Sequence, residues 1–298
     1  MQFIVIDYFW FFGDFVSNNN MSNDNIFSDN MNSSNEIMSN DCNRIYVCSD
    51  CIEGIFSAIY DIFTHLSRHE TTHDNCKIIA GEIGNFELFS EYIDVKTDNE
   101  KALKVTRKIC DRFGFECYQS FLYAASCNDD KKADAIYKSI LSGLRTGAGF
   151  KLLNMWTDKN IAHINILSRS AFNEFASWRE FLQFHELSNN TLFSRIAPKC
   201  DILMFLSSHF ANRFPNEDFM IYDEVRDKYL VHEKQKECVI IIGNGINPDE
   251  ETYFSDEDIK IDKLFKIFTS TIAIKERMNK KLQQQLIPLR IQNYKIEF

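Results

Sequence analysis

The 298-residue sequence contains few residues that break regular structure, with only 4 Pro and 10 Gly. This scarcity excludes a collagen-like repeat and a Pro-rich disordered chain. Hydrophobic residues make up 45% of the sequence, and Phe alone occurs 27 times, which is enough apolar surface to build a substantial core. The composition therefore favours a globular fold.

Basic residues are absent from the first 43 positions, which carry six carboxylates and supply −6 of the net charge of −10. An acidic chain cannot surround duplex nucleic acid with a general positive field, because that mode of binding needs many Lys and Arg side chains. Any contact with DNA must therefore use a local basic patch.

The sequence also lacks long apolar runs, and its cysteines do not form a disulfide pattern. The apolar start of the chain is interrupted by Asp7 and Asp14, lacks the basic residues that open a signal peptide, and is shorter than the ~20 residues that span a bilayer. The nine cysteines are odd in number and scattered, which indicates reduced thiols. We expect a cytoplasmic protein without membrane contact.

The pattern along the chain predicts an α+β fold, with a helix-rich half and an antiparallel β-meander closed by a C-terminal helix. We expect residues 1–43 to be a disordered Asn/Ser-rich leader and 44–298 to form a single domain. Residues 67–85 read as polar and irregular. Helices are expected over 52–66, 97–113, 116–126, 130–146, 158–177, 198–213 and 255–288, and strands over 45–47, 87–95, 181–187, 191–198, 219–225, 228–233 and 238–243.

Two short motifs suggest metal or redox chemistry. His69-Glu70-Thr71-Thr72-His73 matches H-E-x-x-H, in which two His side chains one helical turn apart bind zinc. Its flanks are polar throughout and no third ligand follows, so we favour a solvated loop or helix end. Cys48 and Cys51 have C-x-x-C spacing before a helix whose N-terminus could lower a thiol pKa, but no second pair completes a zinc site.

A third group carries more weight. His209 and Arg213 lie one turn apart on one helix face, Asp223 ends the following strand, and Arg226 comes soon after. Such a group could bind a phosphate, or His209 and Asp223 could act in acid and base chemistry. The simpler alternative is an Arg–Asp bridge that fixes a helix on a sheet.

The C-terminal segment contains the one concentration of positive charge. Its basic residues are Lys275, Arg277, Lys280, Lys281, Arg290 and Lys295. They could contact phosphates, or they could form the solvated positive end of a helix, where positive charge is favourable.

Four segments resemble the family of probable DNA metabolism proteins. They are YVCSDCIEGIFSAIYDIF, NEFASWREFLQFHEL, SSHFANRFPNEDFMIYDEVR and FTSTIAIKERMNKKLQQQLIPLR, which follow one another in the family's order and together extend over most of 44–298. The positions that match are Glu53, Gly54, Glu174, Phe184, Glu186, His209, Arg213, Asp223, Arg226, Asn279, Gln285, Pro288 and Arg290. Gln183 and His185 depart from the family, which commonly has Arg there.

The resemblance implies a role in DNA repair or modification beside a radical S-adenosylmethionine protein. Our first hypothesis is an accessory protein that binds this partner, and possibly DNA, with no cofactor of its own. The binding residues would be Arg213, Arg226, Glu174, Glu186, Arg277, Asn279, Lys280, Lys281 and Arg290. The alternatives are an enzyme that acts on nucleic acid or nucleotide through His209 and Asp223 and, more remotely, a zinc hydrolase using His69 and His73.

Overall fold

The computed structural model describes residues 3–5, 43–67, 72–243, 260, 263–264, 285 and 287–294. The chain divides into two compact units, one made of Met1–Asn19 and Asn173–Phe298 and the other of Asn20–Phe172. Both units combine helices with a β-sheet, so the α+β class is confirmed. The single domain expected over 44–298 stays a prediction, and each unit is described by itself.

The sheet of unit 20–172 has three parallel strands in the order β3-β2-β4. Their bounds are β2 Asn43–Cys48, β3 Cys76–Ala80 and β4 Ser90–Asp94. Ile45 and Tyr46 are adjacent and both fully buried, which is typical of a central parallel strand covered on both faces. Strand β3 corrects the sequence prediction that 67–85 is irregular. Its short apolar core is masked in the sequence by polar flanks, and pairing with β2 determines its structure.

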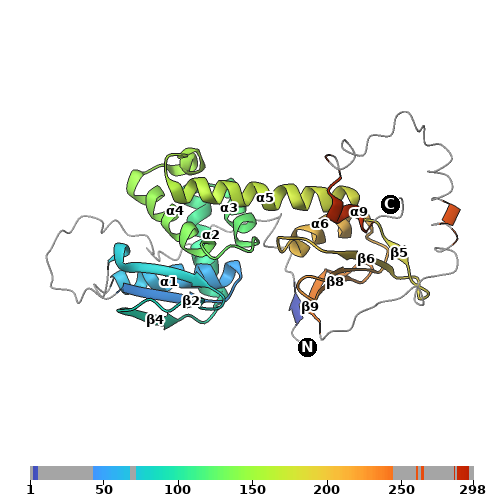
Figure 1. Cartoon of the computed structure of the whole chain (residues 1–298), viewed down its shortest axis with the longest axis horizontal. Helices are drawn as coiled ribbons and strands as arrows, with labels where there is room; N and C mark the ends of the chain where they lie inside the picture. The colour runs from blue at the N-terminus through green and yellow to red at the C-terminus, as the bar shows by residue number, and fades with distance from the viewer. Residues whose placement is uncertain are drawn as a thin grey trace. The chain divides into compact units, whose positions relative to one another are not determined.

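Helices pack against this sheet (Figure 1). The helical elements are α1 Ile52–Ser67, η2 His73–Asn75, α2 Asn99–Phe113, α3 Phe115–Ala125, α4 Lys132–Thr146, η3 Gly149–Asn154 and the first part of α5 Lys159–Phe181. Helix α1 packs against β2, β3 and α2, whereas α4 packs against β3. Asp98 caps α2 by accepting hydrogen bonds from the backbone N–H groups of Glu100 at 2.9 Å and Lys101 at 3.3 Å.

Asp50 precedes α1 but does not cap it. The thiol of Cys51 accepts the N–H of Gly54 at 3.4 Å, which places a sulfur atom at the cap. Asp50 instead forms an ion pair at 2.6 Å with Lys132, whose side chain is buried and also donates to the carbonyl of Cys127. A buried ammonium needs such partners, and this requirement takes the carboxylate away from the helix start.

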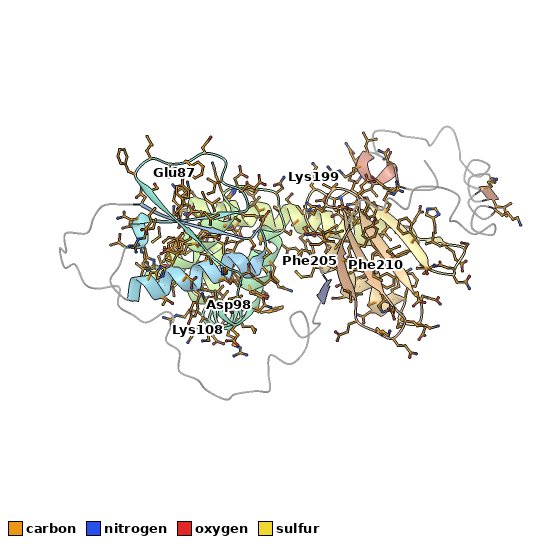
Figure 2. The ribbon with its side chains drawn as sticks, turned by 90° about the horizontal axis from the view of Figure 1, so that it is seen from below. Glu87, Asp98, Lys108, Lys199, Phe205 and Phe210 are labelled. Atoms are coloured by element: carbon orange, nitrogen blue, oxygen red, sulfur yellow. The ribbon has the colours of Figure 1, made fainter. Side chains whose placement is uncertain are left out.

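The sheet of the other unit has six strands in the order β1-β9-β8-β7-β6-β5. Their bounds are β1 Phe3–Val5, β5 His185–Glu186, β6 Leu192–Ile196, β7 Phe219–Asp223, β8 Lys228–His232 and β9 Val239–Ile242. The antiparallel meander β7-β8-β9 and the hairpin β5-β6 are confirmed. Strands β6 and β7 are parallel, because α6 Leu203–Arg213 crosses between them. Its Phe205 and Phe210 are buried (Figure 2).

Both chain ends depart in part from expectation. Phe3–Val5 forms β1 on the edge of β9, although 1–43 was expected to be disordered, because three apolar residues can extend an unpaired sheet edge. Most of that leader and of the helix expected over 255–288 lies outside the described residues. Gln285 is helical and Ile287 is not, but helical structure resumes after Pro288 in the short helix α9 Leu289–Gln292, as the fixed φ of proline allows. Among the described helices, none has the length and apolar character needed to cross a membrane.

Substituting Gly54 tests the packing at the start of α1. A Cβ atom at Gly54 would lie 2.5 Å from the backbone oxygen of Ser49, and backbone cannot move aside as a flexible side chain can. We expect Gly54→Ala to lower the free energy of unfolding by about 1–3 kcal/mol, although Ala is the better helix former. Urea unfolding followed by circular dichroism measures this change. Gly84→Ala is the matched control, because no atom lies within 4 Å of that Cβ position, and equal stability of both variants would contradict the prediction.

Candidate functional site

The segment 198–201, which we call the clamped loop, leads from β6 toward α6 and is held by two charged side chains. The carboxylate of Glu174 on α5 accepts the backbone N–H of Lys199 at 2.7 Å and that of Cys200 at 2.9 Å. The guanidinium of Arg226 donates to the carbonyl oxygens of Pro198, at 3.1 Å, and Lys199. One carboxylate and one guanidinium therefore satisfy four backbone groups of a connection that has no regular structure. Figure 2 labels Lys199 in this loop.

Asp223 anchors the arginine that holds the clamped loop. Its side chain is fully buried at the end of β7, and one carboxylate oxygen accepts the guanidinium of Arg226 at 3.0 Å. The other accepts the N–H groups of Val225 at 3.0 Å and Arg226 at 3.3 Å. Burial raises the pKa of Asp223 above its ordinary value, and the charge and hydrogen bonds of Arg226 counteract part of that rise.

The C-terminus joins the same network. Arg290 of α9 forms an ion pair with Glu174 at 3.1 Å, and Tyr294 donates to Glu224 in the turn after β7. Lys228 pairs with Asp201 inside the clamped loop. Elements far apart in the sequence are thus tied together by groups that bond one another, which indicates a structural role for Glu174, Asp223, Arg226 and Arg290. An Arg–Asp bridge is formed by Arg226 and Asp223, but it holds the clamped loop and does not fix a helix on the sheet as the sequence alternative expected.

A different arrangement surrounds His209. The charges of Arg179, at the end of α5, and of Arg213, at the end of α6, both act on its imidazole. Burial is the largest cause that lowers the pKa of His209 below its ordinary value, followed by Arg179 and Arg213, so the imidazole is neutral near pH 7. We call Arg179, His209 and Arg213 the cationic group.

The cationic group has spare capacity to bind an anion. Arg213 is exposed and lies over the ring of Phe214, 5.6 Å from its centre. Arg179 lies over Phe175 at 5.4 Å and reaches its neighbour Glu180 at 3.7 Å, a long contact on a half-exposed side chain. Two planar guanidinium groups beside a neutral imidazole, backed by aromatic rings, match the donors that recognise phosphate.

Acid and base chemistry at His209 has less support. A catalytic base is normally oriented by a third polar group. Within the part of the chain that the structure describes, no hydrogen bond to the His209 ring is formed, and both oxygens of Asp223 are engaged with Val225 and Arg226. The role of Asp223 as the orienting group therefore stays a prediction that this geometry does not favour.

The other sequence-predicted binding residues lie apart or outside the described residues. Glu186 is half-buried in β5, where it pairs with Leu192 across the hairpin. Arg277, Asn279, Lys280 and Lys281 fall outside the described residues, so their contact with DNA stays a prediction.

The local backbone geometry does not favour a zinc site at the H-E-x-x-H motif. His69 is outside the described residues, but Thr72 has an extended backbone, with φ −118° and ψ 155°, so no continuous helix carries the motif. His73 instead lies within 2.8 Å of the hydroxyl of Tyr137, and burial, followed by Arg145, lowers its pKa to about 4. Among the described residues no cluster of three or more His, Cys, Asp or Glu side chains could hold a metal ion.

The Cys48–Cys51 pair is not activated. Burial raises the pKa of Cys48 to about 12 and that of Cys51 to about 11, so neither thiol ionises near neutral pH. The possibility that the helix N-terminus lowers a thiol pKa here is therefore wrong, because desolvation outweighs the dipole. All eight described cysteines are free thiols.

Sequence reasoning missed Arg179. With Glu180, it is one of two charged residues in the helical segment SWREF, where a charge usually marks the solvated face. The spacing of His209 and Arg213 predicted that they share a helix face. The proximity of Arg179 to them depends on the packing of α5 beside α6, which the sequence pattern does not indicate.

Comparison with known families identifies the family of the chain. The family described as a domain of unknown function, DUF4130, matches residues 130–297, which is more than half of the chain, and the chain belongs to this family. The matched residues contain the clamped loop and the cationic group. No curated protein and no solved structure is significantly similar to the chain.

The two arginines should differ sharply in their effect on stability. Arg226→Ala leaves the buried Asp223 carboxylate without its partner, so we expect the free energy of unfolding to fall by about 3–5 kcal/mol. Arg213→Ala removes an exposed side chain and should change it by less than about 0.5 kcal/mol. Urea unfolding compares the variants. Equal losses would show that Arg213 is structural as well.

Proposed function

We propose that this member of the DUF4130 family is an accessory protein of DNA repair or modification, which binds nucleic acid or a protein partner and works beside a radical S-adenosylmethionine enzyme. The observation that supports a binding role is that Arg179 and Arg213 lie close enough to His209 for their charges to act on its imidazole. The link to DNA and to the radical enzyme, and with it a cytosolic location, is supported by the resemblance to the probable DNA metabolism proteins.

A local basic surface is what an acidic chain needs for this task. The net charge of −10 repels a nucleic-acid backbone at long range, so affinity must come from a few well-placed cations. Each guanidinium can donate two parallel hydrogen bonds to one phosphate. The resulting contact would be to the phosphate backbone, so its affinity would not depend on the base sequence. This property suits a protein that positions DNA for another enzyme.

Binding is favoured over catalysis by the way the polar groups are used. Glu174, Asp223 and Arg226 are occupied by internal partners, whereas Arg213 is exposed. The second candidate, an enzyme that uses His209 as its base, is supported by one observation, the neutral imidazole near pH 7. Turnover by the purified chain without any partner would favour it.

Removing Arg213 should weaken binding while the fold is retained. A charge-assisted hydrogen bond contributes about 1.5–3 kcal/mol, so Arg213→Ala should reduce affinity for a single-stranded or duplex oligonucleotide by about tenfold or more. Fluorescence anisotropy at low salt measures the affinity. Lys236→Ala, which removes an exposed cation from the turn between β8 and β9, is the matched control and should leave the affinity unchanged. Equal affinities of the wild type and Arg213→Ala would show that the cationic group does not bind the oligonucleotide.

The same binding should strengthen as the pH falls. The pKa of His209 is lowered in the free protein, and a bound phosphate would favour the imidazolium and raise it. Proton uptake is then coupled to binding, so oligonucleotide affinity should increase between pH 7.5 and pH 5.5. His209→Ala should abolish this increment and keep most of the affinity at pH 7.5. An unchanged pH profile in His209→Ala would assign the effect to other groups.

A further inference from the structure

Unit 20–172 contains a pocket of about 660 Å³ whose lining includes, of the candidate site residues discussed above, His73 alone. Its walls come from η2, the length of α4 and the beginning of α5, and Figure 1 shows the last two elements close together. A volume of this size is typical of a site for a small organic molecule.

The charge of the pocket wall is positive. Four cations line it, Lys131, Lys138, Arg145 and Lys159, against two carboxylates. Both carboxylates are already matched, since Arg145 pairs with Asp74 at 3.2 Å and Lys138 with Asp134 at 2.8 Å. Lys131 and Lys159 are exposed and form no ion pair within the described residues, although the charge of Lys131 acts on Asp129.

Two further carboxylates, which do not line the pocket, form hydrogen bonds with residues that do. Asp129 accepts from the backbone N–H of Lys131 at 2.9 Å and lies 3.0 Å from the ring nitrogen of His163. Asp158 accepts from the hydroxyl of Ser142 and from the backbone N–H of Asn160 at 2.8 Å. These hydrogen bonds hold the starts of α4 and α5.

The remaining wall is neutral or apolar. His73 is uncharged near neutral pH, because burial and Arg145 lower its pKa to about 4, and its ring packs on Phe63 with centres 5.1 Å apart. Ala135 and Leu141 add apolar surface. The pocket therefore offers two ammonium groups for an anion and an uncharged wall for a less polar body.

We propose that this pocket binds a small phosphomonoester of about the size of a nucleoside monophosphate, with Lys131 and Lys159 holding the phosphate. An ammonium is a compact point charge that binds phosphate well. The site is independent of the function proposed above, because all its residues belong to unit 20–172 and the cationic group belongs to the other unit.

Isothermal titration calorimetry of the full chain with adenosine monophosphate, and with adenosine as the probe that lacks the phosphate, tests the proposal. We expect adenosine monophosphate to bind at least about tenfold more tightly than adenosine. The double variant with Lys131→Ala and Lys159→Ala should bind adenosine monophosphate at least about tenfold more weakly than the wild type does. Both lysines are exposed, so the double variant should keep the wild-type circular dichroism spectrum and melting temperature.

Two control variants separate this site from other causes. Lys108→Ala, on α2 and outside the pocket lining (Figure 2), should bind adenosine monophosphate as the wild type does, and Arg213→Ala should keep the pocket's preference for adenosine monophosphate over adenosine. Retained nucleotide binding in Arg213→Ala supports the pocket even if the oligonucleotide experiment fails. Equal affinity for adenosine and adenosine monophosphate, absence of binding, or full binding by the folded double variant would overturn the proposal.

Discussion

A buried carboxylate must be matched by donors, and among the described residues of unit 1–19/173–298 that constraint is most severe at Asp223. Arg226 supplies the match, and its remaining donors are directed at the carbonyls of the clamped loop. Glu174 then holds the N–H groups of the same loop and is itself paired with Arg290. The β6–α6 connection, the turn after β7, α5 and α9 are thereby fixed by one network of charges.

This network explains why the most polar residues of the unit are poor candidates for binding. Each charge in it is already opposed by another, so a ligand would have to break an internal pair before it gained a contact. The cationic group is built in the opposite way. Its guanidinium groups lie on aromatic rings at the ends of α5 and α6, and Arg213 forms no ion pair within the described residues. Charge that is not balanced internally is available to a phosphate or to a partner carboxylate.

Local signals predicted most helices and the meander, because apolar periodicity and turn residues act over a few positions. Strand β3 was missed because it is short and its place is set by pairing with β2, and the parallel pairing of β6 with β7 depends on the crossover through α6. At the site, the spacing of His209 and Arg213 predicted their shared face. The partner of Asp223 and the contribution of Arg179 depend on tertiary packing, and so does the desolvation that keeps Cys48 and Cys51 protonated.

The most direct test of a binding role is a pull-down with tagged wild type and tagged Arg213→Ala from extract of the native cells, with and without nuclease, followed by mass spectrometry. The proposal predicts that the wild type retains a radical S-adenosylmethionine protein, or nucleic acid that nuclease removes, and that Arg213→Ala retains markedly less. If both proteins retain the same material in the same amount, or neither retains any, the cationic group does not carry the function and the proposed binding role is contradicted.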